Sequence, residues 1–322
     1  MARIAVLGGG SFGTAVAAAA ARGGEEVALV CRTARQAEAI GRTGRNADYF
    51  PDIALPPGLR ATAEVDACRA AEVLFLAIPA RHMDDYMPLL SGGLRPGAAV
   101  VNLVKGLDTR RLTFAERFAQ DAPGVGYVAL KGPTFARPLL LGEYSGLTIG
   151  TADPALEARL RALFGGGAID FDSCASAAAV DAVSALKNIY AIMLGVLASL
   201  NLSDNTRFMF ITRVLAEARQ VMEVLGFDPG VVSLYCGVGD ILLTGSCDTS
   251  RNRTLGLMIG KGIPVDPNRP DFLAEGVRSV RIIAEHLPPG AAPLIGALTA
   301  VLDGAIPPGE MPDILLRGRA AA

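Results

Sequence analysis

Lys187 is the clearest candidate for chemistry in this sequence, because the residues around it are almost all apolar. It lies in the run 177–200, which holds one glycine and no proline and predicts a single long buried helix. An unpaired ammonium group in an apolar core costs on the order of several kcal/mol. Lys187 must therefore face a polar cavity, as a catalytic lysine does, or reach water as a snorkelling side chain. Because Asp181 and Asn188 also interrupt the run, we expect no stable membrane insertion.

A glycine-rich segment near the N-terminus predicts a dinucleotide site. The apolar run 3–7 leads into G-G-G-S-F-G at residues 8–13 and then into an alanine-rich helical pattern. In a Rossmann domain the first glycine of G-x-G-x-x-G permits a tight turn, the second lets the backbone approach a pyrophosphate, and the third lets helix and strand pack closely. Gly8, Gly10 and Gly13 take these places, and the helix N-terminus offers N–H groups to the anion.

The second predicted strand, 26–31, ends without the acidic residue that would bind a free ribose 2′-hydroxyl. Arg32, Thr33 and Arg35 follow it instead. Guanidinium groups suit a 2′-phosphate, so we expect NADP(H) to be accepted as well as NAD(H). The alternative is that these arginines lie on a solvated turn.

Further polar candidates follow two later predicted strands. Lys105 comes directly after the apolar run 98–104, and a Gly-Pro-Thr turn, with Gly132 and Thr134, comes after the run 126–130. In a doubly wound sheet the carboxyl ends of the strands face the ligand crevice. We therefore expect Lys105 near the cofactor.

Asp240 and the segment 250–253 are the remaining candidates. Asp240 follows two glycines, which predicts a carboxylate on an open turn. Arg251 and Arg253 flank an asparagine, as phosphate-binding groups often do. A capping aspartate and a solvated basic turn are the alternative interpretations.

The elements that must position these residues fall into two predicted domains. Strand patterns alternate with helical ones up to residue 176, and the pattern is helical from there on, including 206–225 and a helix from about 228 to 236. We predict an α/β Rossmann-type dinucleotide-binding domain at residues 1–176 and an all-α C-terminal domain for substrate and catalysis at 177–322. The predicted strands are 3–7, 26–31, 72–79, 98–104, 126–130, 147–150 and 168–171.

The composition excludes several other classes of protein. A formal net charge of -2 leaves no basic excess for a nucleic acid partner. The five cysteines are an odd number without close spacing, which indicates neither a disulfide framework nor a metal site. The sequence has only two histidines, which argues against a Ser-His-Asp triad on composition alone. If the protein is an enzyme, we expect a lysine or a carboxyl group as the proton donor. No export signal is visible, and we expect a cytoplasmic protein.

Taken together, these stretches resemble one family, the bacterial-type NAD(P)-dependent glycerol-3-phosphate dehydrogenases. They follow the family's order from about residue 4 to 280, and their combination is far more specific than any one motif. The matching stretches are 8–15, 46–51, 77–79, 105–106, 132–136, 185–188, 204–206, 237–244, 250–252 and 274–277.

The resemblance implies reversible reduction of dihydroxyacetone phosphate to sn-glycerol 3-phosphate by NAD(P)H, for glycerophospholipid synthesis, in a homodimer. By position, Lys187 resembles the family's general acid/base, and Asp240 would orient it or hold a substrate hydroxyl. The residues that resemble substrate contacts are Lys105, Gly132, Thr134, Lys187, Asp240, Ser250, Arg251 and Asn252. Those assigned to the cofactor are Gly8, Gly10, Ser11, Phe12, Gly13, Arg32, Lys105, Ala136, Arg251, Leu273 and Glu275.

The sequence departs from the family pattern at four places. Gly9 replaces a common alanine, and Arg137-Pro138 stands where the family tends to carry an acid. Gly245-Ser246-Cys247 stands where the family often has Thr-Cys, and the segment 207–210, Arg-Phe-Met-Phe, replaces small residues. Two other functions stay open: a related lysine-dependent reductase such as a 2-dehydropantoate reductase, which should lack the 250–252 phosphate group, and a nucleotide-sensing protein without turnover.

Overall fold

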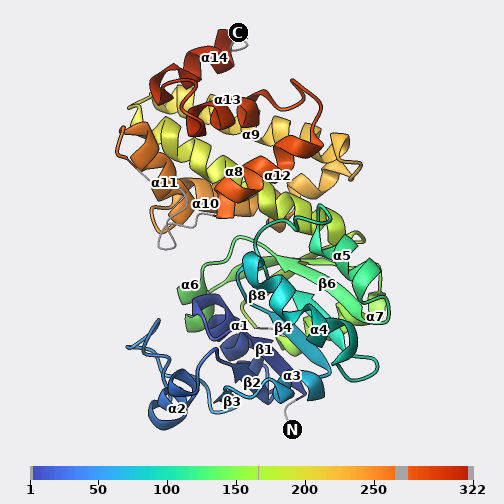
Figure 1. Ribbon diagram of the computed structural model, residues 1–322. Coiled ribbons are helices and arrows are strands. Elements are labelled where there is room, and N and C mark those ends of the chain that lie inside the picture. The colour runs from blue at the N-terminus through green and yellow to red at the C-terminus, as the bar shows by residue number, and fades with distance from the viewer. Residues whose placement is uncertain (1–2, 166, 265–274, 318–322) are drawn as a thin grey trace. The chain divides into compact units, whose positions relative to one another are not determined.

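The computed structural model describes residues 3–165, 167–264 and 275–317. The chain forms two compact units, Met1–Val180 and Asp181–Ala322 (Figure 1). The dividing point lies within the first turn of the long helix α8, Ala177–Ser199.

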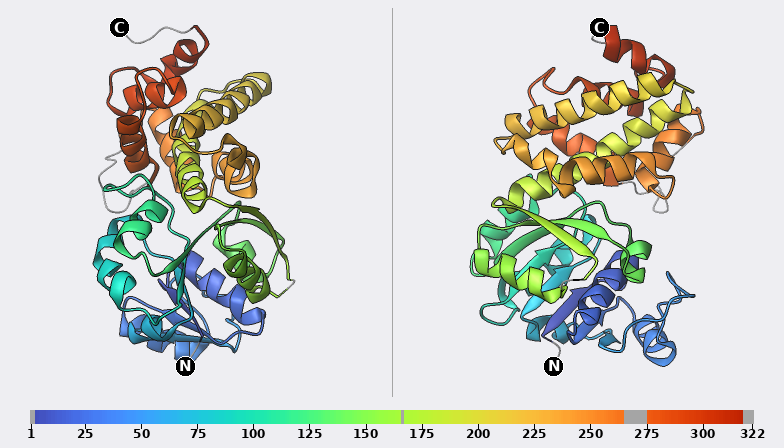
Figure 2. Two further views of the ribbon diagram at one scale, coloured as in Figure 1. Left: turned by 90° about the vertical axis from the view of Figure 1, so that its right-hand side faces the viewer. Right: turned by 180° about the vertical axis from the view of Figure 1, so that it is seen from behind.

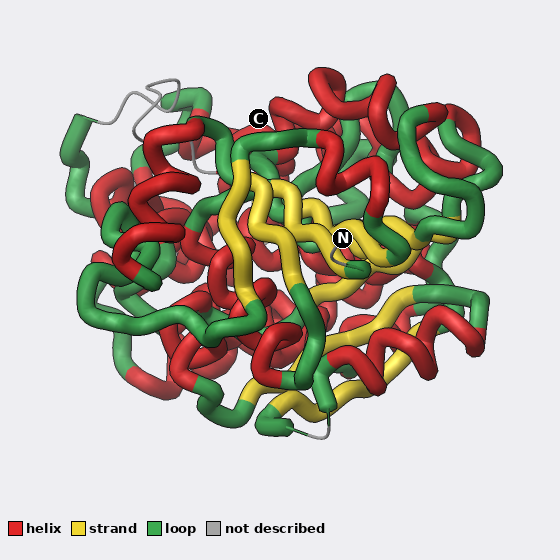
Figure 3. The backbone as a smooth tube through the Cα atoms, turned by 90° about the horizontal axis from the view of Figure 1, so that it is seen from below, coloured by secondary structure: helices red, strands yellow, loops and turns green. Residues whose placement is uncertain are grey.

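The first unit is built on one eight-stranded sheet with the order β3-β2-β1-β4-β5-β6-β7-β8. All neighbouring strands are parallel except β6 and β7, which pair antiparallel. Figure 3 shows the strands of this sheet in yellow with helices beside them. The strands are β1 Ile4–Leu7, β2 Val27–Val30, β3 Leu59–Thr62, β4 Val73–Leu76, β5 Ala99–Asn102, β6 Gly126–Lys131, β7 Ser145–Gly150 and β8 Ile169–Cys174.

Strands β1, β2, β4 and β5 are buried on both faces, which explains why they are almost entirely apolar. Ile4 and Val6 of β1 belong to one apolar core, and Ala5 and Leu7 belong to the other. Helices α1, α2, α6 and α7 contribute to the first core, and α3, α4 and α5 to the second. These helices are α1 Ser11–Arg22, α2 Ala34–Thr43, α3 Asp66–Ala70, α4 Met83–Gly92, α5 Phe114–Asp121, α6 Ala136–Leu141 and α7 Pro154–Leu163.

Strand β3 is the one element of the sheet that the sequence pattern did not reveal. It carries Arg60 and Thr62 and forms the edge of the sheet, where it pairs only with β2. An edge strand is partly exposed, so it lacks the continuous apolar run that marks the buried strands.

The second unit is helical (Figure 2), as the sequence predicts. Its helix α8 has the length and composition of a membrane span, but 89% of its most apolar window is buried inside the protein, as in a core helix of a globular domain. The other helices are α9 Asp204–Val224, α10 Asp240–Ser246, α11 Arg251–Gly260, α12 Glu275–His286, α13 Pro293–Leu302 and α14 Met311–Arg317.

The helix predicted from about 228 to 236 is wrong. A 3-10 turn occupies Pro229–Ser233 and a π-type turn occupies Tyr235–Gly239. Asp228 caps the first turn by accepting a hydrogen bond from the Gly230 N–H at 2.8 Å. Gly237 lies so close to the first turn that an added Cβ would be 2.3 Å from the Val232 carbonyl oxygen. The two short turns pack closely together, and α10 begins directly after the second turn, at Asp240.

Candidate active site

The glycine-rich loop has the geometry that each of its three glycines predicts. Gly8 has a φ of +121°, and a Cβ there would lie 2.4 Å from the Ala77 carbonyl oxygen. At Gly13 an added Cβ would lie 2.0 Å from the Gly8 carbonyl oxygen, whereas at Gly10 it would meet nothing within 4 Å. Gly10 is the N-cap of α1, so the first N–H groups of this helix are left for an anion.

A buried polar network lies behind this loop. The Asn46 amide nitrogen donates to the Gly9 carbonyl at 3.0 Å and to the Thr14 hydroxyl at 2.8 Å. Gln36 donates to the same Gly9 carbonyl at 2.7 Å and to the Asn46 amide oxygen at 3.3 Å. The loop 46–57 contains the stretch 46–51 that resembles the family, but the contacts by which Asn46 fixes the glycine loop are visible only in the structure.

The same network accounts for the departure at Gly9. A Cβ on this residue would lie 2.8 Å from the Cys31 sulfur and 3.1 Å from the Gln36 side-chain oxygen. Cys31 and Gln36 thus occupy the space that an alanine methyl group needs. Burial raises the pKa of the Cys31 thiol to about 11, so this sulfur is an uncharged packing group.

Lys105 lies just beyond the carboxyl end of β5, where the sequence predicted it. Its ammonium group lies 5.0 Å from the centre of the Phe12 ring, so two residues assigned to the cofactor meet within the first unit. The preceding segment is held by Lys131, whose Nζ donates to the carbonyls of Asn102 at 2.9 Å and Val104 at 2.6 Å. Sequence reasoning did not identify Lys131 as a support of this segment.

The Gly-Pro-Thr turn packs against β7. An added Cβ on Gly132 would lie 2.3 Å from the Gly146 carbonyl oxygen, and the Thr134 hydroxyl donates to that same oxygen at 3.2 Å. Ala136, the first residue of α6, follows this turn directly. Only glycine fits the first place of the turn, and the threonine fixes its other end.

Arg137 explains the second departure from the family pattern. It forms two hydrogen bonds with the Asp52 carboxylate, at 3.1 and 2.5 Å, and so joins α6 to the 46–57 loop. The Arg137 guanidinium holds the pKa of Asp52 below its usual value. Both side chains are half exposed, so the pair positions the loop more than it stabilises the fold.

The arginines after β2 are placed to meet solvent or a ligand. Arg35 lies 3.7 Å from the Asp48 carboxylate with most of its side chain exposed. Arg32 is also exposed and forms no ion pair with any residue in the described ranges. An available guanidinium at this place suits a 2′-phosphate.

In the second unit, Lys187 and Asp240 form a buried ion pair. Lys187 is 1% exposed and Asp240 is 2% exposed, and the Lys187 Nζ donates to Asp240 Oδ2. The snorkelling alternative for Lys187 and the open turn predicted for Asp240 are therefore both wrong. Asp240 is the first residue of α10 and lies inward because the π-type turn leads directly into this helix.

Thr244 supports the Lys187–Asp240 pair through a hydrogen bond to the carboxylate. One turn along α10, its hydroxyl donates to Asp240 Oδ1 at 3.2 Å. Each oxygen of the Asp240 carboxylate thus has a donor of its own, which fixes the plane of the carboxylate. The spacing of four residues on a helix is the only signal in the sequence for this contact.

Asn188 follows Lys187 on α8 and joins three helices. The Asn252 amide of α11 donates to Asn188 Oδ1 at 2.9 Å, and Asn252 Oδ1 accepts from the Gly276 N–H of α12 at 3.2 Å. The Asn188 amide nitrogen is buried and has no hydrogen-bond partner in the part of the chain that the structure describes. A buried donor left unpaired is costly, so this group marks a place for a ligand oxygen.

Residues 250–252 form the N-terminal end of α11, so the alternative interpretation of this segment as a solvated basic turn is wrong. Ser250 is the buried N-cap, and its hydroxyl accepts from the Arg253 N–H at 3.3 Å. Arg251 is the first helical residue and is exposed. Two further residues were assigned to the cofactor: Glu275 is the first residue of α12, and Leu273 lies outside the described residues.

Comparison with known proteins identifies the family. The family sequence model described as NAD-dependent glycerol-3-phosphate dehydrogenase N-terminus matches residues 3–157. The corresponding family model for the C-terminus matches residues 177–313. A protein of Ectopseudomonas mendocina named glycerol-3-phosphate dehydrogenase [NAD(P)+] is 33% identical over 98% of this chain and 94% of its own length. A protein of the same name from Brucella suis biovar 1 is 35% identical over 98% of this chain and 97% of its own length.

Solved structures show the same fold. Glycerol-3-phosphate dehydrogenase from Coxiella burnetii has a TM-score of 0.87 at 24% identity and covers 98% of both chains. A ketopantoate reductase family protein from Ralstonia eutropha has a TM-score of 0.58 at 16% identity, over 94% of this chain and 98% of its own. The chain belongs to the NAD-dependent glycerol-3-phosphate dehydrogenase family.

Proposed function

We propose that this chain reversibly reduces dihydroxyacetone phosphate to sn-glycerol 3-phosphate with NADH or NADPH. The observation that carries the proposal is the buried pair of Lys187 and Asp240, with the available amide donor of Asn188 next to it on α8. A charged donor and a neutral donor on one helix suit a substrate oxygen that gains negative charge.

The proton chemistry follows from these three residues and Thr244. The bound nicotinamide supplies the hydride. As the substrate carbonyl becomes an alkoxide, the oxygen needs a proton and a positive neighbour, and Lys187 provides both. Asp240, held by Thr244, keeps the Lys187 ammonium in place. In the opposite direction the neutral amine accepts the proton of the substrate hydroxyl.

The start of α11 is assigned to the substrate phosphate. Arg251 brings an exposed guanidinium, and the first N–H groups of α11 favour an anion. Asn252 and Ser250 hold this helix start in its position through their contacts with Gly276 and Arg253. The other substrate contacts that we assign are Lys105, Gly132 and Thr134.

We assign the cofactor to the domain 1–176 and the catalytic groups to the domain 177–322. The glycine loop takes the pyrophosphate, and Arg32 takes a 2′-phosphate where one is present. The remaining cofactor contacts of the proposal are Ser11, Phe12, Lys105, Ala136, Arg251, Leu273 and Glu275. The proposal includes a cytoplasmic homodimer that provides sn-glycerol 3-phosphate for glycerophospholipid synthesis.

The test is the loss of nicotinamide absorbance when the purified chain meets dihydroxyacetone phosphate with NADH or NADPH. We expect oxidation of the cofactor with this substrate and little or none with unphosphorylated dihydroxyacetone. Arg251→Gln should raise KM for the phosphorylated ketone at least about tenfold, since a bidentate guanidinium contact is lost. Turnover of 2-dehydropantoate in its place, or no turnover of any ketone, would reject the proposal.

A further inference from the structure

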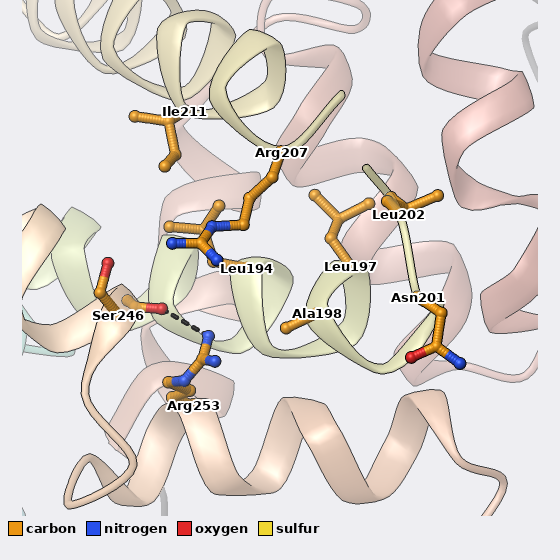
Figure 4. Close-up of a pocket in the computed structure, with 10 residues that line it drawn as sticks. Leu194, Leu197, Ala198, Asn201, Leu202, Arg207, Ile211, Ser246 and Arg253 are labelled. Carbon is orange, nitrogen blue, oxygen red and sulfur yellow. Dashed lines mark hydrogen bonds between the residues drawn. The ribbon is translucent and has the colours of Figure 1, made fainter. Parts of the chain in front are cut away.

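The second unit contains a cavity whose lining does not include Lys187, Asn188, Asp240 or Thr244 (Figure 4). It has a volume of about 260 Å³. Its first apolar residue, Leu194, follows Lys187 by two turns of α8, which is about 10 Å along the helix axis. The lining residues are Leu194, Leu197, Ala198, Asn201, Leu202, Arg207, Ile211, Gly245, Ser246 and Arg253.

Two arginines from different helices enter this cavity. Arg207 comes from α9 and Arg253 from α11, and their guanidinium groups point into the space beside Ser246 (Figure 4). No acidic residue is among the described residues that line it. Among the described lining residues, these two guanidinium groups are therefore the only charged groups that face the cavity.

The carboxylates that accompany these arginines lie in solvent. Asp204 is 3.8 Å from Arg207 with 85% of its side chain exposed, and Asp248 is 3.2 Å from Arg253 with 86% exposed. Such pairs are screened by water and bind their partners weakly. An anion inside the cavity would therefore compete for the guanidinium groups at little cost.

The guanidinium of each arginine is held in place by a second contact. Arg253 donates to the Gly245 carbonyl at 2.7 Å. Arg207 lies 5.5 Å from the centre of the Phe208 ring, so the departure from the family pattern at 207–208 supplies a cation–π contact to this guanidinium. Ordering of a long side chain before a ligand binds reduces the entropy lost on binding.

The other large part of the lining is apolar and consists of Leu194, Leu197, Ala198, Leu202 and Ile211. A cavity that combines a cationic end with an aliphatic wall selects a ligand with an anionic head and an apolar body. Its volume is below the roughly 300–1,000 Å³ of pockets for drug-sized ligands, so the ligand must be small.

We propose that this cavity is a binding site for a small amphipathic anion, a carboxylate or phosphate head on a short alkyl chain. The head would contact Arg207, Arg253 and the Ser246 hydroxyl, and the chain would lie on the leucine side chains of α8. The site does not depend on the proposed activity, because neither arginine is assigned a role in that reaction.

The experiment titrates the full chain with hexanoate, hexan-1-ol and inorganic phosphate by isothermal calorimetry. Hexanoate should bind more tightly than the alcohol, which lacks the charge, and more tightly than phosphate, which lacks the chain. Arg207→Gln should raise the hexanoate dissociation constant at least about fivefold and leave that of hexan-1-ol unchanged. Arg219→Gln, an exposed arginine on the same helix, is the matched control and should change neither.

Ala198→Leu provides a second variant, because it fills the cavity without altering its charge. Both Ala198→Leu and Arg207→Gln should weaken hexanoate binding, and circular dichroism shows whether each variant is folded. If one variant does not fold, the hexanoate affinity of the other variant tests the proposal. Equal affinities for hexanoate and hexan-1-ol, an unchanged hexanoate affinity in the folded variants, or no saturable hexanoate binding by the unaltered chain overturns the proposal.

Discussion

Each unit of this molecule buries a lysine, and the two ammonium groups donate to acceptors of different kinds. Lys131 of the first unit is 3% exposed and donates to the backbone carbonyls of Asn102 and Val104. Lys187 of the second unit is 1% exposed and donates to the carboxylate of Asp240. Both side chains lie in apolar surroundings, so burial alone does not separate them.

The difference lies in the groups around each ammonium. Backbone carbonyls offer partial charges that belong to the fold, and they leave the cation in one position. A carboxylate offers a full charge, and beside Lys187 the Asn188 amide keeps a donor for a ligand. A buried lysine thus indicates chemistry when its neighbours include polar atoms that the protein does not satisfy itself.

The largest expected effect is that of Lys187→Ala on turnover. Removal of the proposed general acid should lower kcat by roughly 10³-fold or more, while the dissociation constant of NADPH stays within about twofold. Steady-state kinetics and fluorescence titration measure the two quantities. An equal loss of turnover and cofactor affinity, or turnover within tenfold of the unaltered chain, contradicts the catalytic role.

Lys131→Met should act on stability. It leaves two buried carbonyls without their donor, so the free energy of unfolding should fall by about 2–5 kcal/mol. Urea denaturation measures the change. Lys105→Met is the matched control on the segment that Lys131 holds, and its effect should stay below about 1 kcal/mol because Lys105 is only half buried. If the two variants are equally stable, the structural role of Lys131 is wrong.

Glu217 of α9 extends the comparison to a buried carboxyl group. It accepts from the N–H groups of Leu294 at 2.5 Å and Ile295 at 3.1 Å, and from the Tyr190 hydroxyl at 3.3 Å. Burial raises the pKa of Glu217 from its usual 4.5 to about 7, although these hydrogen bonds oppose the rise. The folded state therefore holds this proton more tightly than the unfolded state.

The sign of the resulting pH dependence follows from the raised pKa. The contribution of Glu217 is complete below about pH 4.5 and is lost as the pH rises to about 7. Between pH 5 and pH 8, the stability of Glu217→Gln relative to the unaltered chain should increase by roughly 1–3 kcal/mol. Urea titrations across this range measure it, and a difference that does not vary with pH would count against the raised pKa.

Asn46→Ala should produce the smallest change, in the binding of the cofactor. Without the hydrogen bonds to Gly9 and Thr14 the glycine loop loses part of its support, so KM for NADH should rise about tenfold while kcat changes by less than about twofold. Glu38→Gln, an exposed change on α2, is the control. Asn46→Ser should restore part of the affinity, and an unaltered KM in Asn46→Ala excludes the positioning role.

The parts of the fold that could be predicted are those whose burial produces a recognisable run of apolar residues in the sequence. Seven of the eight strands were predicted, and the clearest of them, β1, β2, β4 and β5, are short runs that are buried throughout. The edge strand β3 and the turns around Pro229 and Gly237 were missed or misassigned. Their form depends on contacts with neighbouring segments, such as that of Gly237 with Val232, which the local pattern does not record.

The candidate site shows the same limit. Lys187 is conspicuous because its charge interrupts an apolar helix, but the two glycines before Asp240 suggested exposure where the structure has burial. Asn46 and Thr244 lie in stretches that resemble the family, but their contacts were not predicted, because the partner atoms are distant in sequence or one helical turn away. A single sequence identifies residue types that can react, whereas the residues that hold them require the coordinates.

The filled space beside Gly9 links two positions in the history of this chain. An alanine at position 9 would place its methyl group 2.8 Å from the Cys31 sulfur, so Gly9 cannot become alanine while the Cys31 side chain keeps its place. A lineage that exchanges Gly9 for alanine must first, or at the same time, accept a smaller or differently oriented side chain at position 31. Relatives with alanine in the loop are therefore expected to differ at the end of β2, and an alignment of the two positions would show them changing together.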